Sequence, residues 1–336
     1  MINPVYSPSA ARYDCGMRYR RCGRSGVLLP EISLGMWHNF GDMNPFSNAL
    51  AMAHYAFDHG ITHFDLANNY GPSYGSAEET FGQIMKKSFR PYRDELFVAT
   101  KAGYDMWPGP YGNWGSRKSL MASLDQSLRR MNLDYVDVFY SHRYDPETPL
   151  EETMQTLVDM VRQGKALYVG ISKYPADKAD EAYRYLAERD VHCLLYQGRY
   201  NLFDRVLDEQ GILAQARDNG AGFIAFSPLA QGLLTSRYLD GVPEDSRMAQ
   251  GRFLKREVLT GAVLEKIKAL NEVASGRGQT LAEMSLAWLL KDETVTSVIV
   301  GASSVSQLED NLNALRNVSF SDGELARIKQ ICEGQA

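Results

Sequence analysis

The sequence predicts a single (β/α)8 barrel, also called a TIM barrel, and three observations support this fold class. Short apolar runs alternate with longer segments of helical period along about 300 residues of the chain. There are eight such runs, and each is apolar throughout, as is typical of parallel strands that are buried on both faces. No GxGxxG turn follows an early strand, so a doubly wound dinucleotide-binding sheet is disfavoured.

The eight candidate strands are short and lie between the helix-like segments. They cover residues 32–35, 61–65, 96–100, 135–141, 166–172, 193–197, 222–227 and 297–301. The run MRYRRCGRSGVLLP, residues 17–30, precedes the first of them, and its glycines at Gly23 and Gly26 predict a β-hairpin turn. We expect this hairpin to lie at the bottom of the barrel.

Segments of helical period separate the candidate strands. They cover residues 48–59, 77–87, 117–131, 150–162, 176–188, 208–219 and 305–315. Ser76 and Ser116 directly precede two of these segments, and serine is a common cap at a helix N-terminus. Glu78 and Glu79 fall in the first turn after Ser76, where the helix dipole favours acidic side chains.

The crossover before the eighth strand is longer than the others. It starts at Ala230 and contains a polar, turn-rich stretch at residues 238–252. Two segments of helical period follow it, at residues 262–274 and 281–290. A last predicted helix, residues 322–332, closes the chain.

The chain of 336 residues is long enough for two ordinary domains or for one large barrel. No internal repeat, low-complexity tract or linker marks a second domain. We therefore expect one barrel domain over residues 17–336, preceded by a flexible N-terminal segment at residues 1–16.

Composition excludes several classes of protein. The chain is 44% hydrophobic and 23% charged, as is typical of a soluble globular protein. No apolar run approaches the roughly 20 residues that span a bilayer. The N-terminus also lacks the apolar core of a secretory signal. We expect a protein that neither crosses a membrane nor is exported.

Charge and cysteine content favour a cytoplasmic protein with a small-molecule partner. The net charge is −5 and the basic residues are scattered, which argues against binding to nucleic acid. The cysteines show no CxxC pair or zinc-type spacing, so we expect free thiols in a reducing cytoplasm. They are Cys15, Cys22, Cys193 and Cys332.

Polar side chains end or follow several of the candidate strands. In a (β/α)8 barrel the carboxyl ends of the strands converge on one mouth, and catalytic groups lie there. The residues in these places are Asp65, Lys101, His142, Ser172 and Gln197, with Tyr70 on the loop after the second strand. We expect them to lie around one site.

A charged residue directly follows the buried run LFVAT. This residue is Lys101, and a buried charge is costly unless it is paired. Asp65 on the neighbouring strand is its natural partner. A structural ion pair alone would explain these two residues, so a catalytic interpretation depends on Tyr70 and His142.

Tyr70 and His142 give the charged pair a chemical use. A tyrosine has an ordinary pKa of about 10, and a nearby ammonium favours the phenolate and lowers that value. We therefore expect Lys101 to lower the pKa of Tyr70. Tyr70 would then donate a proton to an oxygen that gains negative charge, while His142 hydrogen-bonds to this oxygen or orients the substrate.

The runs FDLANNYG, VATKAG and FYSHR occur in this order on successive candidate strands, and GISKY, YQGRYN, FSPLAQGLLTSRY and IVGASSVSQLEDN follow them. The first three resemble the Asp, Tyr, Lys and His tetrad of the aldo-keto reductases, and the others resemble the cofactor segments of that family. Each run alone is a weak signal, but the ordered set covers nearly the whole chain. Within the family, THFDLANNYG and TSVIVGAS are similar to the bacterial group that reduces L-glyceraldehyde 3-phosphate, and to potassium-channel β subunits.

The resemblance implies an NADPH-dependent reductase that moves a hydride from the nicotinamide to a carbonyl, with Tyr70 as the acid. NADPH or NADP+ would be the cofactor, and a small aldehyde or ketone the substrate. The implied cofactor-binding residues are Gly35, Trp37, Asp65, Ser172, Gln197, Phe226, Ser227, Leu229, Gln231, Arg237, Arg247, Ser303, Gln307, Asp310 and Asn311.

The resemblance also implies parts for these residues. Ser172 and Gln197 would hold the carboxamide, and Phe226 would stack on the nicotinamide. The pyrophosphate would be lined by Ser227, Leu229, Gln231 and Arg237, and Arg247 in the long crossover would close over the cofactor. The helix after the eighth strand would take the adenosine end, where its N-terminus and a hydroxyl suit a 2′-phosphate.

The loop YDMWPGPYGNWG is expected to wall the substrate pocket. The pocket residues implied are Trp37, Tyr70, Tyr104, Trp107, His142 and Arg143. Arg143 is open to two interpretations, a contact to a phosphorylated aldehyde or a structural salt bridge. Lys173 departs from the pattern, because many family members have Asn after the serine of the fifth strand, and it is a candidate contact for an anionic group.

Two other functions stay open. His63 and Asp65 alternate on one face of a strand end, as ligands do in metal-dependent hydrolases, although few of the six histidines lie near strand ends. A nucleotide-binding regulatory module like the channel β subunits would share the tetrad; the lack of a long N-terminal extension disfavours it. The substrate is open among glyceraldehyde 3-phosphate, methylglyoxal and other small aldehydes, and a homo-oligomer is equally open.

Overall fold

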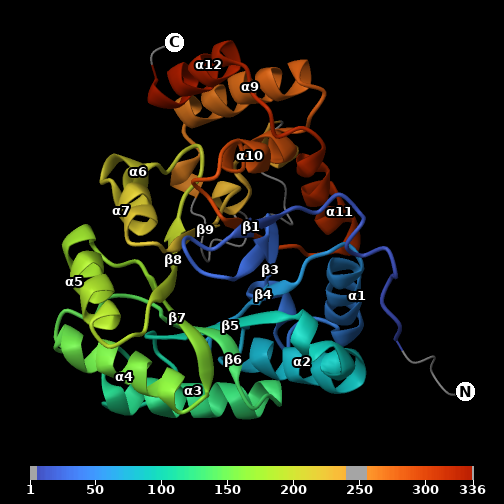
Figure 1. The fold of residues 1–336 in the computed structure, drawn as a ribbon. Helices are drawn as coiled ribbons and strands as arrows, with labels where there is room; N and C mark the ends of the chain where they lie inside the picture. The colour runs from blue at the N-terminus through green and yellow to red at the C-terminus, as the bar shows by residue number, and fades with distance from the viewer. Residues whose placement is uncertain (1–5, 240–255, 335–336) are drawn as a thin grey trace, which may run out of the picture.

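Eight parallel strands close into a barrel in the computed structural model, which describes residues 6–239 and 256–334. The strands follow one another around the barrel in chain order, and the last, β10, pairs with the first, β3. Figure 1 shows the helices arranged around the outside of this barrel. The predicted (β/α)8 fold is therefore confirmed.

The barrel strands lie where the apolar runs predict them. They are β3 (Ile32–Gly35), β4 (His63–Asp65), β5 (Phe97–Ala102), β6 (Val136–Ser141), β7 (Ala166–Ser172), β8 (Cys193–Arg199), β9 (Gly222–Phe226) and β10 (Ser297–Val300). Two strands extend further than predicted. β5 includes Lys101, and β8 continues two residues beyond Gln197.

The helices agree with the prediction in place and differ in detail. They are α1 (Phe46–Asp58), α2 (Ser76–Ile84), α3 (Arg117–Met131), α4 (Leu150–Arg162), α5 (Ala176–Ala187), α6 (Val206–Glu209), α7 (Ile212–Asp218), α9 (Gly261–Gly276), α10 (Leu281–Leu289), α11 (Val305–Asn313) and α12 (Asp322–Glu333). The predicted helix 208–219 is broken at Gly211, whose φ of +72° ends the helical path. The predicted helix 77–87 ends at Ile84 and passes into a π-helical turn.

The two serines that precede predicted helices behave differently. Ser116 caps α3, because its side chain accepts a hydrogen bond from the backbone N–H of Ser119. Ser76 is instead the first residue of α2, with Gly75 at the cap position, and its hydroxyl donates to the carbonyl of Ser73. The acidic side chains do lie in the first turn of α2 as predicted.

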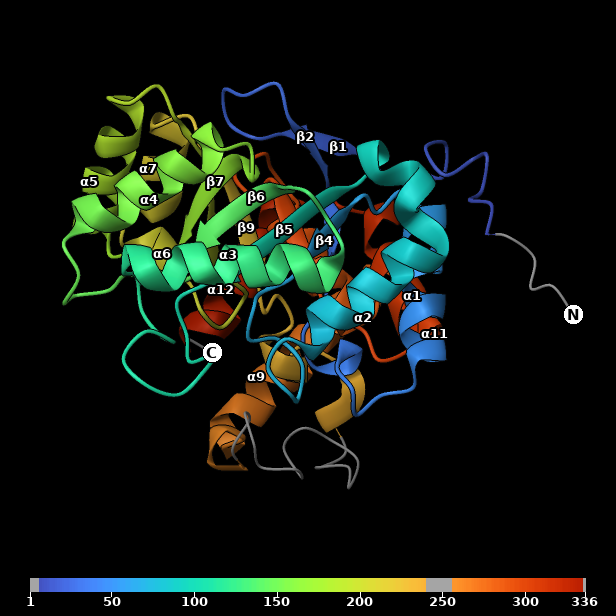
Figure 2. The same ribbon diagram turned by 90° about the horizontal axis from the view of Figure 1, so that it is seen from below.

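The predicted hairpin consists of β1 (Tyr19–Arg21) and β2 (Leu28–Pro30), which pair antiparallel. Figure 2 shows it at one end of the barrel. Cys22 and Leu29 are fully buried there and pack with interior residues of the barrel strands such as Val138. The hairpin therefore closes the end of the barrel that lies away from the carboxyl ends of the strands.

Residues 6–16 lie against the barrel, although the sequence predicts a flexible segment there. The Tyr6 ring stacks on His54 with a centroid distance of 3.8 Å, and its hydroxyl donates to Asp58 at 2.9 Å. Arg12 forms a salt bridge with Glu95 at 2.6 Å. An aromatic ring and one ion pair hold a segment whose composition indicates no regular structure.

A polar group of side chains is buried within the barrel. His63 Nδ1 lies 2.8 Å from the hydroxyl of Ser33, which lies 2.5 Å from the hydroxyl of Ser297. All three side chains are fully buried. His63 is therefore part of the interior packing of the barrel.

The described part of the chain contains no helix that is long and apolar enough to cross a membrane.

Gly82 provides a test of the packing between α2 and α3. A Cβ atom there would lie 2.1 Å from the carbonyl oxygen of Arg130 and 3.1 Å from the carbonyl carbon of Met131. Gly→Ala in a helix interior ordinarily stabilises by about 1 kcal/mol. Here we expect Gly82→Ala to lower the free energy of unfolding by about 1–3 kcal/mol, because backbone atoms have to move apart. Urea unfolding measures the change.

The matched control is Gly276→Ala in α9. A Cβ atom at Gly276 would have no heavy atom within 4 Å. This variant should keep or raise the free energy of unfolding. Equal stability of the two variants would contradict the close approach of α2 to α3.

His63 should make stability depend on pH. Burial lowers its pKa from about 6.5 to about 4, so between these pH values the unfolded chain binds more protons than the folded chain. The free energy of unfolding therefore falls as the pH falls through this window, and the contribution is fully present above pH 6.5. Between pH 7 and pH 5 we expect His63 to account for a loss of about 2 kcal/mol.

Urea unfolding of the wild type and of His63→Gln at both pH values measures this contribution. The variant should lose less stability between pH 7 and pH 5 than the wild type does. Identical pH dependence in the two proteins would contradict the lowered pKa of His63.

Candidate active site

A cleft of about 890 Å³ lies at the carboxyl ends of the barrel strands. It brings together residues that are more than 250 positions apart in the chain, from Gly35 to Gln307. The predicted site residues that line it are Gly35, Trp37, Asp65, Tyr70, Tyr104, His142, Phe226, Ser227, Leu229, Gln231, Arg237, Ser303 and Gln307. The structure thus gathers most of the predicted set around one space.

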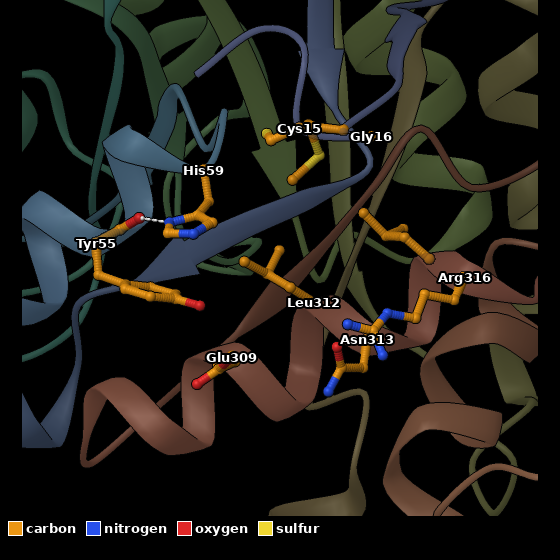
Figure 3. Close-up of a pocket in the computed structure, with 10 residues that line it drawn as sticks. Cys15, Gly16, Tyr55, His59, Glu309, Leu312, Asn313 and Arg316 are labelled. Atoms are coloured by element: carbon orange, nitrogen blue, oxygen red, sulfur yellow. Dashed lines mark hydrogen bonds between the residues drawn. The ribbon is translucent and has the colours of Figure 1, made fainter. Parts of the chain in front are cut away.

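A second cavity, of about 300 Å³, lies between α1, α11 and the N-terminal segment. Figure 3 shows Glu309 and Arg316 at its wall, with Tyr55 and His59 on the opposite side. The His59 ring lies on Tyr55 with a centroid distance of 3.9 Å, so both belong to the packing of α1. None of the four predicted catalytic residues lines this cavity. The larger cleft is therefore the candidate active site.

A buried ion pair joins Asp65 and Lys101 beneath the cleft. Asp65 pairs with Ala99 across β4 and β5, and Lys101 lies two residues further along β5, so both side chains point to the same face of the sheet. Lys101 Nζ donates to Asp65 Oδ2 at 2.7 Å and to the carbonyl of Leu66 at 2.6 Å. The predicted partnership of the two residues is present.

Gln197 completes the pairing of the carboxylate. Its side-chain nitrogen donates to Asp65 Oδ1 at 2.9 Å, so both oxygens of Asp65 are engaged. Burial lowers the pKa of Lys101, and the charge of Asp65 acts against this shift. The ammonium is fully buried, and it depends on the carboxylate to remain charged.

Tyr70 lies over this ion pair. Lys101 Nζ is 4.9 Å from the centre of the Tyr70 ring, and the rings of Trp37 and His142 lie 6.0 Å and 5.9 Å away. The Tyr70 side chain lines the cleft, and residues 6–239 and 256–334 contain no hydrogen bond to its hydroxyl.

The prediction that Lys101 lowers the pKa of Tyr70 is wrong. Burial raises the pKa of Tyr70 well above 10, and the negative charge of Asp65 raises it further. Burial is the larger cause, because it disfavours the charged phenolate, and the carboxylate of Asp65 adds a repulsion. Tyr70 is therefore fully protonated at neutral pH.

His142 lies directly after β6 and faces Tyr70. Burial lowers the pKa of His142 well below 6.5, and the charges of Lys101 and Lys173 lower it further. A neutral imidazole carries one N–H and is a hydrogen-bond donor at physiological pH. Its Nδ1 atom is buried and has no partner in the described part of the chain.

Lys173 also lies at the cleft, beside Tyr104. Its ammonium donates to the Tyr104 hydroxyl at 3.0 Å and lies 5.2 Å from the centre of the Phe226 ring. Its φ is +56°, in the left-handed region that asparagine and glycine adopt more readily than lysine. The residue that departs from the family pattern thus holds an unfavourable backbone conformation at the site.

Buried polar atoms without partners indicate where a ligand fits. Ser172 is the last residue of β7, and its buried hydroxyl has no hydrogen-bond partner among the described residues. Asn311 Nδ2 in α11 is also buried and has no partner among these residues. An unpaired buried polar atom costs about 1–3 kcal/mol, and a ligand with amide and hydroxyl groups would remove that cost. These atoms fit a nicotinamide nucleotide.

A strained loop follows β9 at the edge of the cleft. Ser227, Ala230 and Gln231 all have positive φ values, of +52°, +47° and +59°. Such conformations cost about 1–3 kcal/mol each and are concentrated at ligand-binding sites. This loop is the segment that the family resemblance assigns to the pyrophosphate.

Several predicted residues do not line the cleft. Lys101, Ser172, Gln197 and Asn311 are buried and are not among the lining residues, and Asp310 is exposed on α11. Trp107 is half-buried in the loop after β5 and is not part of the cleft. Arg247 lies outside the described residues.

Arg143 points into the loop between β5 and α3. Its guanidinium lies 3.5 Å from the centre of the Trp114 ring and 4.1 Å from that of Tyr104. It also donates to the carbonyl of Gly103 at 2.8 Å and to Asn113 Oδ1 at 2.9 Å. Arg143 therefore holds the loop after β5 against the barrel.

The cleft also includes residues that sequence reasoning did not single out. Their positions are His38, Asn39, Phe40, Asn44, Asn69, Pro72, Arg199, Pro228, Gly232, Thr235, Tyr238, Ile299, Val300 and Gly301. Most of them flank predicted residues on the same loops, so proximity in the chain was the signal that could have found them. Arg199 is the last residue of β8, in the part of the strand beyond Gln197.

The described residues contain no group of three or more His, Cys, Asp and Glu side chains that could hold a metal ion. His63 lies inside the barrel on Ser33, while Asp65 is engaged by Lys101. The two residues thus serve separate parts of the structure.

Known proteins resemble this chain over most of its length. It is 56% identical to L-glyceraldehyde 3-phosphate reductase of Escherichia coli O157:H7 over 336 residues, which cover 98% of this chain and 97% of the relative. The protein of the same name from strain K12 is 55% identical over the same shares. A probable voltage-gated potassium channel subunit beta of Arabidopsis thaliana is 35% identical, over 89% of this chain and 91% of the relative.

A family model described as "Aldo/keto reductase family" matches residues 31–333, from the start of the barrel into the last helix. The match includes every described residue of the cleft. The closed barrel, the paired Asp65 and Lys101, and these similarities lead to one conclusion: the chain belongs to the aldo/keto reductase family and is an oxidoreductase.

Proposed function

We propose that this protein reduces small aldehydes to alcohols with NADPH, and that L-glyceraldehyde 3-phosphate is among its substrates. The observation that carries the proposal is the convergence of Tyr70 and His142 on one cleft above the buried pair of Asp65 and Lys101. The similarity to L-glyceraldehyde 3-phosphate reductases supports the choice of substrate.

Tyr70 acts as the general acid in this proposal. When bound, NADPH would supply a hydride to the carbonyl carbon. The carbonyl oxygen then takes the Tyr70 proton, and solvent returns a proton to the phenolate. The high pKa of Tyr70 keeps the hydroxyl protonated until this step.

His142 orients the carbonyl. A neutral imidazole donates one hydrogen bond to the carbonyl oxygen without adding a positive charge beside the ammonium of Lys101. The lowered pKa of His142 supports this part, because a protonated imidazole would repel Lys101. Two donors, Tyr70 and His142, would then meet the same oxygen.

The cofactor would lie along the cleft from the barrel mouth to α11. Ser172 and Gln197 would hold the carboxamide, and Phe226 would face the nicotinamide. Ser227, Leu229, Gln231 and Arg237 would contact the pyrophosphate. Ser303, Gln307, Asp310 and Asn311 would hold the adenosine end. The N-terminus of α11 suits the 2′-phosphate that distinguishes NADPH from NADH.

Tyr70→Phe tests the assigned acid. The variant keeps the ring and removes the transferable proton, so we expect kcat for aldehyde reduction to fall about 10²–10⁴-fold while NADPH affinity stays unchanged. Tyr74→Phe is the matched control, because Tyr74 lies on the same loop and is 57% exposed. A wild-type rate in Tyr70→Phe would show that another group donates the proton.

A panel of aldehydes tests the function itself. Steady-state loss of NADPH absorbance is measured with glyceraldehyde 3-phosphate, methylglyoxal, glyceraldehyde and butanal, and again with NADH. We expect turnover with the small aldehydes and a preference for NADPH, since the N-terminus of α11 favours an additional phosphate. Tight nucleotide binding without turnover of any aldehyde would favour a regulatory module like the channel β subunits.

A further inference from the structure

Lys173 is a cation at the cleft that no acidic side chain neutralises within the described residues. Arg199, which also lines the cleft, is paired with Asp204 at 3.1 Å. Lys101 beneath the cleft is paired with Asp65. The ammonium of Lys173 thus keeps a net positive charge beside the proposed reaction centre.

Tyr104 holds this ammonium in place. The Lys173 ammonium lies 4.8 Å from the centre of the Tyr104 ring and donates to its hydroxyl at 3.0 Å. The guanidinium of Arg143 lies 4.1 Å from the centre of the same ring and 3.5 Å from that of Trp114. A stack of alternating rings and cations therefore limits the movement of a long side chain that would otherwise move freely in solvent.

The same ring connects Lys173 to the reacting groups. Tyr104 meets His142 edge to face with a centroid distance of 4.7 Å, and His142 meets Tyr70 at 5.9 Å. The ammonium is therefore one aromatic ring away from the imidazole. A substrate whose carbonyl is held by Tyr70 and His142 would lie in the same cleft as Lys173.

The energetics also favour a role for this side chain. Lys173 holds a left-handed backbone conformation, and its charge contributes to lowering the pKa of both His142 and Lys101, for which burial is the larger cause. A positive charge that no carboxylate balances disfavours the protonated forms of His142 and Lys101. A bound anion would offset that charge.

We infer that Lys173 binds the anionic end of the substrate, a phosphate or carboxylate group carried by a short aldehyde. This inference rests on the proposed function, since it assigns a specificity residue to the same cleft. Lysine is a common phosphate ligand and acts as a point charge, so it suits a phosphate monoester that approaches from the open side of the cleft.

The test compares charged and uncharged aldehydes of similar length. Glyceraldehyde 3-phosphate is paired with glyceraldehyde for the phosphate, and succinic semialdehyde with butanal for the carboxylate. Lys173→Asn should raise KM for the charged member of a pair about 10-fold and leave the uncharged member and NADPH affinity unchanged. Asn suits the left-handed backbone, so this variant removes the charge without adding strain.

Two further variants serve as controls. Lys173→Arg keeps the charge and should restore most of the preference for the charged aldehyde. Lys178→Asn removes the same charge from α5, where Lys178 pairs with Glu181 at 2.8 Å away from the cleft. It should leave every KM unchanged.

Calorimetric titration of glycerol 3-phosphate into the protein saturated with NADP+ adds a measurement that needs no turnover. Wild type should bind it about 10-fold more tightly than Lys173→Asn does. Equal affinity in the two proteins, or an equal change in KM for both members of each pair, would overturn the inference. So would a change in NADPH affinity alone, because it would place the cofactor's phosphates at Lys173.

The outcomes also separate this inference from the proposed function. If the wild type reduces aldehydes and the Lys173 variants behave like it, the inference is wrong and the proposed function is retained. If the wild type reduced no aldehyde, the function would fall, and the titration with glycerol 3-phosphate would still decide on Lys173.

Discussion

The site depends on the buried pairing of Asp65 with Lys101. An ammonium with no exposed surface is stable only because a carboxylate and a backbone carbonyl meet it, and that carboxylate is in turn held by Gln197. Removal of one member of such a pair leaves an uncompensated buried charge, which typically costs about 3–5 kcal/mol. The positions of β4, β5 and β8 in the barrel therefore have to bring Asp65, Lys101 and Gln197 into contact. Tyr70 and His142 lie above this buried group.

Local pattern and barrel geometry together made much of this predictable. An apolar run followed by a polar residue predicts a buried strand and its carboxyl end. In a barrel these ends lie at one mouth, so Asp65 and His142 are predicted to lie there. The electrostatics could not be predicted in the same way. Lys101 was expected to lower the pKa of Tyr70, but the sign depends on Asp65 and on burial, which are three-dimensional quantities.

Loops were the other limit of prediction. Arg143 follows His142 directly, yet it points to Trp114 because the chain turns there, and composition does not encode that direction. Residues 6–16 have no periodicity, but Tyr6 still finds a ring to stack on. The break at Gly211 was also missed, since one glycine within a periodic segment is compatible with a continuous helix.

The hairpin at the other end of the barrel has a consequence for the access of ligands to the site. Because Cys22 and Leu29 fill that end, a molecule that reaches His142 passes through the cleft. Two side chains far from the site thus confine the entry of ligands to the side of the barrel where the strands have their carboxyl ends.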